Sequence, residues 1–350
     1  MDGGWWTKPE QLSDLQKKII EIQIDDDYLI VGPPGSGKTN LLLLRAAYLN
    51  RSNRKRFIVL TFNRVLREFI ASGTSTYGLS PSNVQTYVGW GKDLLSQNGI
   101  SLGNSEDFNE VRANLFKELT LLSKRNDPSN TLDFILIDEV QDYSTDEINL
   151  IRQFAKKIFA VGDSRQRIYE QDGTIDNLKS QIKFYELKHH YRNCLRICRL
   201  ADGIINIVDS PDGLEHTSNY VEKDNPSDVK PPIQGDLKAQ AEAAIEIIKI
   251  QLRAYPDQLI GVLVPKHTDL SVVADILIKS EIGDQCVLQK NEEGYKPIEE
   301  DRRVIISTVH GSKGLEFRAC HILRPPLKTL HSRAPMRLNE SPGPQSLLFF

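Results

Sequence analysis

The sequence has few cysteines and no long apolar segment. Its four cysteines are Cys194, Cys198, Cys286 and Cys320, and the first two stand four residues apart with no second pair to match them. This spacing argues against a disulfide framework and against a zinc site, so we expect reduced thiols in a cytoplasmic protein. No apolar run approaches the length of a membrane-spanning helix, and the N-terminus lacks the basic-then-apolar layout of a signal peptide.

A large excess of one charge is also absent. The 44 basic and 47 acidic residues leave a net charge of −3. This balance excludes a uniformly basic surface that binds nucleic acid, although it allows nucleic acid to bind in a local groove. With 350 residues, of which 39% are hydrophobic, the chain is long enough for two packed domains.

The sequence does contain a phosphate-binding loop. Residues 32–39 read GPPGSGKT and fit the pattern G-x-x-x-x-G-K-[ST]. An apolar run at 28–31 precedes the loop and a leucine-rich segment at 40–47 comes after it, which is the strand–loop–helix context that the pattern requires. We therefore predict a nucleoside triphosphate site formed by Gly32, Pro33, Gly35, Ser36, Gly37, Lys38 and Thr39. Lys38 would reach the β- and γ-phosphates, and the Thr39 hydroxyl would bind Mg²⁺.

A second apolar run ends in two carboxylates. Residues 134–137 are apolar and are followed directly by Asp138 and Glu139. In a parallel sheet this places both side chains at the C-terminal edge. We predict that Asp138 holds Mg²⁺ and that Glu139 is the general base that polarises the attacking water. The alternative, a surface turn after a strand, is disfavoured by the phosphate loop upstream.

Strand and helix patterns alternate along the chain, which predicts a doubly wound α/β fold. Further strand candidates lie at residues 57–61, 84–87, 158–163, 259–264 and 303–308. The expected organisation is a first domain at 1–185 with a small helical insertion near 91–130, a second domain at 186–324 and an irregular tail at 325–350. Residues 209–235 are rich in Pro, Asp, Ser and Asn and are expected to be loop.

Seven short motifs occur one after another in a specific order. They are L-x-x-x-Q at residues 12–16, the phosphate loop, LTFN at 60–63, IDEVQD at 137–142, VGDSRQRIY at 161–169, Tyr-Arg at 191–192 and TVHGSKGLEF at 308–317. This set resembles the UvrD/Rep/PcrA group of superfamily 1 helicases. The resemblance implies two RecA-like domains that clamp one ATP while single-stranded DNA, or a junction of single- and double-stranded DNA, lies across both. It also implies ATP-dependent helicase or translocase activity, 3′ to 5′, in DNA repair or replication.

The resemblance also assigns residues. Gln16 would read the adenine, and Tyr191 would stack on it. Gln166 would sense the γ-phosphate, and Arg192 would be an arginine finger supplied by the second domain. The residues implied for DNA contact are Thr61, Phe62, Asn63, Thr86, Tyr87, Tyr169, Thr308 and His310.

For most of these residues an ordinary structural role is the alternative to a contact with nucleotide or DNA. Phe62, Tyr87 and Tyr169 could be core aromatics, and for Tyr87 the two interpretations balance. Gln16 could be an exposed helix residue. In the same way, Arg192 could be a surface residue and His310 a packed loop histidine.

The chain also departs from the family pattern. Asn40 stands where the family often has an arginine that stacks on the base, and Val88 stands where it has a histidine. After Phe317 nothing matches the family's last motif, V-A-x-T-R-A, so the second domain is expected to be incomplete. We therefore keep a second hypothesis, a helicase-like nucleotide-binding regulator or truncated product without motor activity. A kinase or GTPase is disfavoured, because the guanine-reading Asn-Lys-x-Asp is missing.

Overall fold

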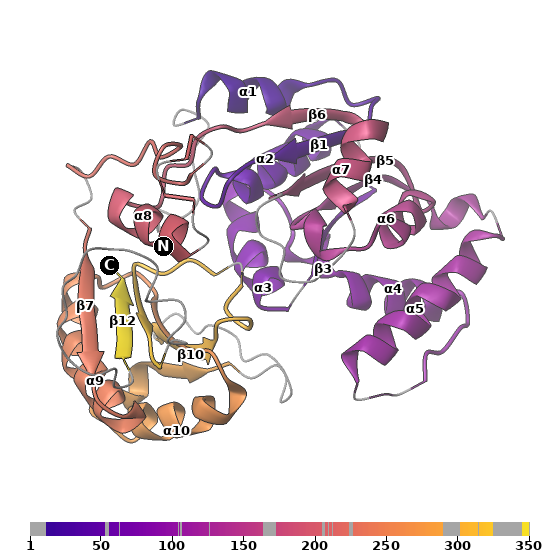
Figure 1. The fold of residues 1–350 in the computed structure, drawn as a ribbon. Helices are drawn as coiled ribbons and strands as arrows, with labels where there is room; N and C mark the ends of the chain where they lie inside the picture. The colour runs from indigo at the N-terminus through magenta and orange to yellow at the C-terminus, as the bar shows by residue number, and fades with distance from the viewer. Residues whose placement is uncertain are drawn as a thin grey trace. The chain divides into compact units, whose positions relative to one another are not determined.

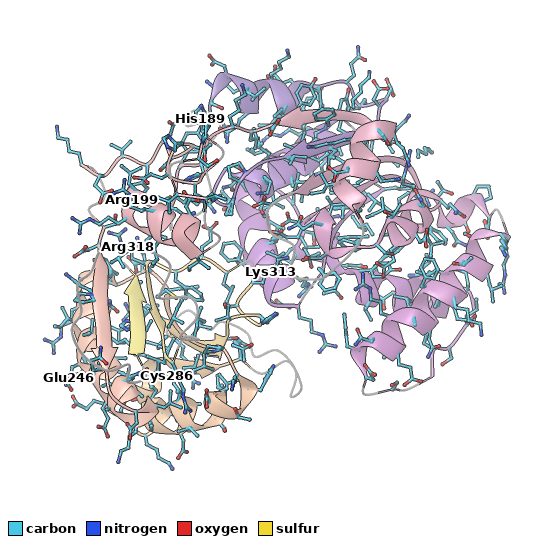
Figure 2. All side chains as sticks on the ribbon, in the orientation of Figure 1. His189, Arg199, Glu246, Cys286, Lys313 and Arg318 are labelled. Carbon is cyan, nitrogen blue, oxygen red and sulfur yellow. The ribbon has the colours of Figure 1, made fainter. Side chains whose placement is uncertain are left out.

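The computed structural model describes most of the chain, and its helices and strands are drawn in Figure 1, with the side chains in Figure 2. The described residues are 12–52, 56–62, 64–103, 105, 107–125, 127–163, 173–204, 207–208, 210–211, 213–223, 227–289, 302–313, 315–324 and 345–349. They divide into two compact units, one up to His190 and one from Tyr191 onward. The predicted division after residue 185 falls inside a strand of the first unit, Lys183–Glu186.

The first unit is built on a six-stranded parallel sheet. Its strands are β1 (Tyr28–Val31), β2 (Phe57–Thr61), β3 (Val84–Thr86), β4 (Leu132–Ile137), β5 (Ala155–Gly162) and β6 (Lys183–Glu186). Their order is β3-β2-β4-β5-β1-β6, and every neighbouring pair is parallel. Because parallel strands end at the same edge, the segments after β1, β4 and β5 meet there.

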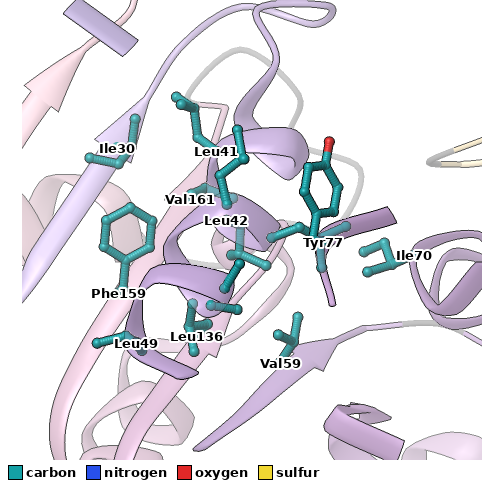
Figure 3. Packing of buried hydrophobic residues seen from close by; sticks show 14 of the residues in the cluster. Ile30, Leu41, Leu42, Leu49, Val59, Ile70, Tyr77, Leu136, Phe159 and Val161 are labelled. Carbon is teal, nitrogen blue, oxygen red and sulfur yellow. The ribbon is translucent and has the colours of Figure 1, made fainter. Parts of the chain in front are cut away.

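Helices cover both faces of this sheet. They are α1 (Asp14–Glu21), α2 (Lys38–Arg51), α3 (Arg64–Gly73), α4 (Tyr87–Gln97), α5 (Phe108–Ser123), α6 (Thr145–Arg152) and α7 (Thr174–Gln181). Short 3₁₀ turns are η2 (Thr74–Tyr77), η3 (Pro81–Asn83), η4 (Pro128–Asn130) and η5 (Val140–Asp142). Ile30, Val59 and Val161 pack with α2 in one buried cluster (Figure 3), while Leu29 and Ile58 pack in another with α4–α7. Strands that are buried on both faces explain the continuous apolar runs, and the predicted doubly wound α/β fold is confirmed.

Helices α4 and α5 occupy the region where a small helical insertion is predicted. Trp90 and Leu94 of α4 and Leu115 of α5 belong to the same buried cluster as the strands beneath them. Arg112 of α5 forms an ion pair with Glu147 of α6, and the two side chains are only 13% and 5% exposed. This region is therefore part of the core of the first unit.

The second unit contains a mixed sheet. Its strands are β7 (Val229–Gln234), β8 (Ile260–Val264), β9 (Cys286–Leu288), β10 (Val304–Thr308), β11 (Ala319–Ile322) and β12 (Gln345–Phe349), in the order β7-β12-β11-β8-β10-β9. The four strands from β11 to β9 are parallel, and β12 runs antiparallel to both β11 and β7 (Figure 1). Around them lie α8 (Leu195–Ile204), α9 (Leu237–Ala254), α10 (His267–Ile278) and the 3₁₀ turn η6 (Gly283–Gln285). Both units are therefore α/β, as the sequence predicts.

Two segments differ from the sequence-based expectation. Residues 229–234 lie in the range predicted to be loop and form β7, and residues 345–349 lie in the predicted irregular tail and form β12. Pro231 and Pro232 argue against a strand in the sequence. Proline is nevertheless tolerated in an edge strand, and β7 lies at the edge of its sheet. These two strands pair with each other across more than a hundred residues, so no local pattern reveals them.

The four cysteines form no disulfide, and no helix within the described ranges is both long and apolar enough to span a membrane. Cys194, Cys198 and Cys286 are buried, and Cys286 lies in β9 (Figure 2). Burial raises the pKa of the Cys286 thiol to about 12, which keeps it protonated at neutral pH.

Candidate nucleotide-binding site

The phosphate loop joins β1 to α2, and its glycines are required by the backbone. Gly35 and Gly37 have φ values of 78° and 83°, in the left-handed region that other residues rarely adopt. A Cβ on Gly32 would lie 2.8 Å from both Leu187 Cβ and Ser36 Oγ. No side chain of the described residues caps the N-terminus of α2, and the N–H groups at a helix N-terminus favour an anion.

Lys38 and Ser36 supply further donors in this loop. Lys38 is 8% exposed, and its Nζ donates to the carbonyl oxygens of Gly32 at 2.9 Å and Pro33 at 3.0 Å. The Ser36 hydroxyl is buried and makes no hydrogen bond to any residue that the structure describes. A buried ammonium group held by neutral carbonyls, beside an unpaired hydroxyl, fits the oxygens of a phosphate group.

Thr39 and Asp138 meet at the C-terminal edge of the sheet. The Thr39 hydroxyl donates to Asp138 Oδ2 at 3.1 Å, and Asp138 is 1% exposed. Burial, and then the charge of Glu139, raise the pKa of Asp138 to about 7, while the bond from Thr39 opposes that rise. A divalent cation would favour the ionised carboxylate. Mg²⁺ binds through one or two carboxylates together with phosphates and water, so these two residues fit a magnesium site.

Glu139 comes after Asp138 in an unusual conformation. Its φ is 50°, where the chain leaves β4 and enters η5. Its carboxylate Oε2 accepts a hydrogen bond from Gln141 Nε2. The predicted base therefore lies beside the predicted metal ligand, and its orientation depends on a residue that the sequence analysis did not assign. The signal in the sequence is the polar residue four positions after the strand, within IDEVQD.

Gln16 connects α1 to the phosphate loop. Its Oε1 accepts from the Ser13 N–H at 2.9 Å, and its Nε2 donates to the Ser36 carbonyl at 3.1 Å. The first bond completes a capping box at the start of α1. With 7% of its surface exposed, Gln16 is not the exposed helix residue of the plainer interpretation. Its contact with adenine stays a proposal.

Arg45 fixes the other end of α1, and sequence reasoning missed it. It is 1% exposed and donates to the carbonyls of Ile20 and Ile22, both at 2.7 Å, and of Gln23 at 2.9 Å. These carbonyls lie at the C-terminus of the helix, where they have no partner within it. A charged residue inside the leucine run of α2 was the available signal.

Asn40 explains one departure from the family pattern. It is 2% exposed, and its Oδ1 accepts from the Tyr77 hydroxyl at 3.0 Å. Tyr77 belongs to η2 and packs against α2 in the cluster of Figure 3. Position 40 therefore faces the packed interior between α2 and η2.

Two aromatic residues predicted to stack on DNA bases lie in the core instead. Phe62 is 8% exposed and Tyr87 is 1% exposed. Their rings make edge-on contacts with Tyr143, with centroids 5.6 and 5.7 Å away. The Arg112 guanidinium also lies over the Phe62 ring, 4.9 Å from its centroid. The structure supports the core interpretation for both residues, because neither ring presents a free face.

The other predicted DNA contacts differ in exposure. Thr61 and Thr308 are buried at the ends of β2 and β10, and Thr86 caps α4 by accepting from the Gly89 N–H at 3.0 Å. His310 is exposed on the turn after β10. Asn63, Tyr169 and the predicted sensor Gln166 lie outside the described residues.

Tyr191 and Arg192 open the second unit. Tyr191 is 42% exposed. Arg192 forms an ion pair with Glu316 of the TVHGSKGLEF motif, and both side chains are about one-third exposed, at 30% and 29%. Neither residue can be assigned to the nucleotide from the second unit alone, so their roles stay proposals.

Comparison with known proteins finds one family that is similar to part of the first unit. Residues 16–172 match the family described as an AAA domain. This range contains the phosphate loop and the carboxylates of Asp138 and Glu139. The curated proteins gave no match. The match to the AAA domain family therefore agrees with the nucleotide-binding geometry described above.

Several solved structures are similar at low identity. Bacteroides Pif1 bound to ssDNA is 16% identical, covers 57% of this chain and 48% of its own, and has a TM-score of 0.31. The DUF1998 helicase MrfA bound to DNA is 13% identical, with 88% and 44% covered and a TM-score of 0.45. The Pyrococcus furiosus Hef helicase domain is 13% identical, with 88% of each chain covered and a TM-score of 0.34. The chain spans about half the length of the first two.

Proposed function

We propose that the chain is an ATP-dependent motor on single-stranded DNA, a helicase or translocase that moves 3′ to 5′ in DNA repair or replication. The observation that carries the ATPase part is the hydrogen bond between Thr39 and Asp138. It joins the phosphate loop to the carboxylate strand across 99 residues of sequence, with Glu139 next in the chain. Groups suited to bind phosphate, to hold a metal ion and to act as a base thus lie at one edge of the sheet.

Each residue of this edge has a defined part in hydrolysis. Lys38 and the N–H groups of the loop bind the β- and γ-phosphates. Thr39 and Asp138 would hold Mg²⁺, which supplies charge neutralisation on the phosphates when bound. Glu139 accepts a proton from the water that attacks the γ-phosphorus, and ADP leaves with the bridging oxygen.

The second unit would complete the site. In this proposal Tyr191 stacks on the adenine that Gln16 reads, Arg192 stabilises charge on the transferred phosphoryl group and Gln166 senses the γ-phosphate. Hydrolysis then requires both units, which is how ATP turnover could drive movement along a strand. The motif order from Gln16 to Phe317 supports this arrangement. A cytoplasmic location is part of the same proposal.

DNA would lie across the ends of β2, β3 and β10. Thr61, Thr86, Thr308 and His310, with Asn63 and Tyr169, supply hydroxyl, amide and ring groups that suit a strand without sequence preference. With the Phe62 and Tyr87 rings in the core, fewer aromatic faces are left for stacking. We therefore expect binding to depend more on backbone contacts than in a site with many stacked bases.

The burial of Phe62 and Tyr87 also supports the second candidate. A helicase-like protein that binds nucleotide but moves along no strand needs a phosphate loop and no stacking platform. Such a regulator would bind ATP tightly and turn it over slowly, whether or not DNA is present.

ATP hydrolysis measured with and without single-stranded DNA separates the two candidates. We expect DNA to stimulate the native chain, and Glu139→Gln to lower kcat by about 10²- to 10⁴-fold, because the general base is lost. Glu246→Gln is the matched control, since Glu246 lies exposed on α9 (Figure 2). ATP turnover that DNA does not stimulate would contradict the motor hypothesis. Tight ATP binding without turnover would favour the regulator.

A further inference from the structure

Gln141 uses both ends of its side-chain amide at the site edge. Its Nε2 donates to Glu139 Oε2, and its Oε1 accepts from the backbone N–H of Asp163 at 3.0 Å. Gln141 is 7% exposed. Glu139 lies just after β4 and Asp163 just after β5, and these strands are parallel neighbours. The side chain therefore bridges two adjacent strand ends and contacts the predicted base directly.

The partners determine which way the amide points. A backbone N–H only donates, and an ionised carboxylate only accepts, so the oxygen must face Asp163 and the nitrogen must face Glu139. The backbone at Gly162 packs closely against the amide, because a Cβ on Gly162 would lie 2.8 Å from Gln141 Oε1 and 2.7 Å from Val140 Cγ1. The amide is thus held in one position between β5 and the carboxylate.

We propose that Gln141 is a positioning residue for ATP hydrolysis. It holds the Glu139 carboxylate in the orientation that accepts the proton of the attacking water, and it ties this orientation to the backbone at the end of β5. The inference rests on the proposed function, because only a hydrolytic site uses Glu139 as a base. Gln141 itself exchanges no proton: water loses one to Glu139, and the amide keeps both of its own.

The bridge predicts a change in kcat and not in nucleotide binding. Gln141→Met keeps the length of the side chain and removes both hydrogen bonds. We expect kcat for ATP to fall about 10- to 100-fold, since a base displaced by about 1 Å can cost that much. The KM for ATP should stay within about twofold, because the phosphate loop is untouched. Gln181→Met, at an exposed glutamine of α7, is the control and should change neither constant.

A double-mutant cycle with Glu139→Gln shows whether Gln141 acts through the base. In that background Gln141→Met should have no further effect on kcat, because the carboxylate it orients is gone. An equal further loss would mean a general structural role and would overturn the inference. If Gln141→Met does not fold, Gln141→Glu serves instead, since it keeps the acceptor for Asp163 and replaces the donor to Glu139 with a like charge; it should show the same loss.

The same experiment separates failure of the inference from failure of the function. A native chain that turns over no ATP overturns both. A native chain that is active and loses activity in Glu139→Gln, but keeps it in Gln141→Met and Gln141→Glu, overturns the role of Gln141 alone.

Discussion

Both units contain a set of parallel strands, and they differ in the segments that leave the C-terminal ends of these strands. In the first unit the segments after β1 and β4 converge, and Thr39 bonds to Asp138. In the second unit the turn after β10 is closed on itself: Thr308 Oγ1 accepts from the Gly311 N–H, and the Ser312 hydroxyl donates to the Val309 carbonyl, both at 3.0 Å. Similar sheets therefore carry different chemistry, because their C-terminal edges present different groups.

The units also bury different polar groups. The first unit buries Arg45, Gln16 and Gln141 in hydrogen bonds that position its loop and its base. The second unit buries His321 against Gln251, with Nε2 and Oε1 2.8 Å apart, at the centre of its sheet. The buried amides of Gln16 and Gln141 thus lie at the proposed site, whereas the buried ring of His321 lies within the sheet.

The sharpest test of this contrast is to remove the proposed contribution of the second unit. Arg192→Ala should lower kcat for ATP by about 10³-fold or more if Arg192 is an arginine finger, while ATP binding by the first unit changes only a few-fold. Steady-state kinetics and nucleotide titration measure the two effects. Arg199→Ala, at an exposed arginine paired with Glu215 (Figure 2), is the control. Full activity in Arg192→Ala would show that the first unit works alone.

The next largest effect concerns stability of the first unit. Arg112→Met removes one partner of the buried pair with Glu147, together with a bond to the Asp142 carbonyl at 3.1 Å. We expect the free energy of unfolding to fall by about 3–5 kcal/mol, because Glu147 is left charged and buried. Urea unfolding followed by tryptophan fluorescence reports on this unit, since Trp90 lies in its buried cluster.

Arg196→Met provides the comparison in the second unit. Arg196 pairs with Asp228 on the surface, where its side chain is 68% exposed, so we expect little change. Equal losses of unfolding free energy in the two variants would mean that the buried pair of Arg112 and Glu147 stabilises the fold no more than the surface pair does.

The last effect is a pH dependence that His321 gives to the second unit. Burial lowers the pKa of His321 to about 3, so the folded unit keeps this ring neutral while the unfolded chain protonates it near pH 6.5. The contribution of His321 to the free energy of unfolding should therefore be constant above about pH 7 and fall by about 1.4 kcal/mol per pH unit below 6.5, until about pH 3. Circular dichroism across urea series at several pH values measures this slope.

Replacing the histidine tests that assignment. His321→Gln removes the titrating ring and should remove its share of the slope. His310→Gln, at the exposed histidine after β10, should leave the slope in place. The opposite pattern would mean that the buried His321 is not the source.

The phosphate loop, the strand before it and the Asp138–Glu139 pair could be predicted, because each is a local pattern with one structural context. The antiparallel edge of the second sheet could not be predicted, because β7 and β12 become strands only by pairing with each other. The bridge made by Gln141 and the clamp made by Arg45 depend on contacts between distant segments. Tyr87 was undecided for a similar reason, since an aromatic residue at a strand–helix junction can face either the core or the solvent.

Nucleotide binding tests the central claim most directly, because everything else depends on the first unit holding ATP at its loop. Binding of a fluorescent ATP analogue should require Mg²⁺ for full affinity in the native chain. Lys38→Ala should weaken it at least about tenfold, since hydrogen bonds from a charged group contribute about 1.5–3 kcal/mol. Lys117→Ala, at an exposed lysine of α5, should bind like the native chain. Equal binding by Lys38→Ala, or none by the native chain, would contradict the account.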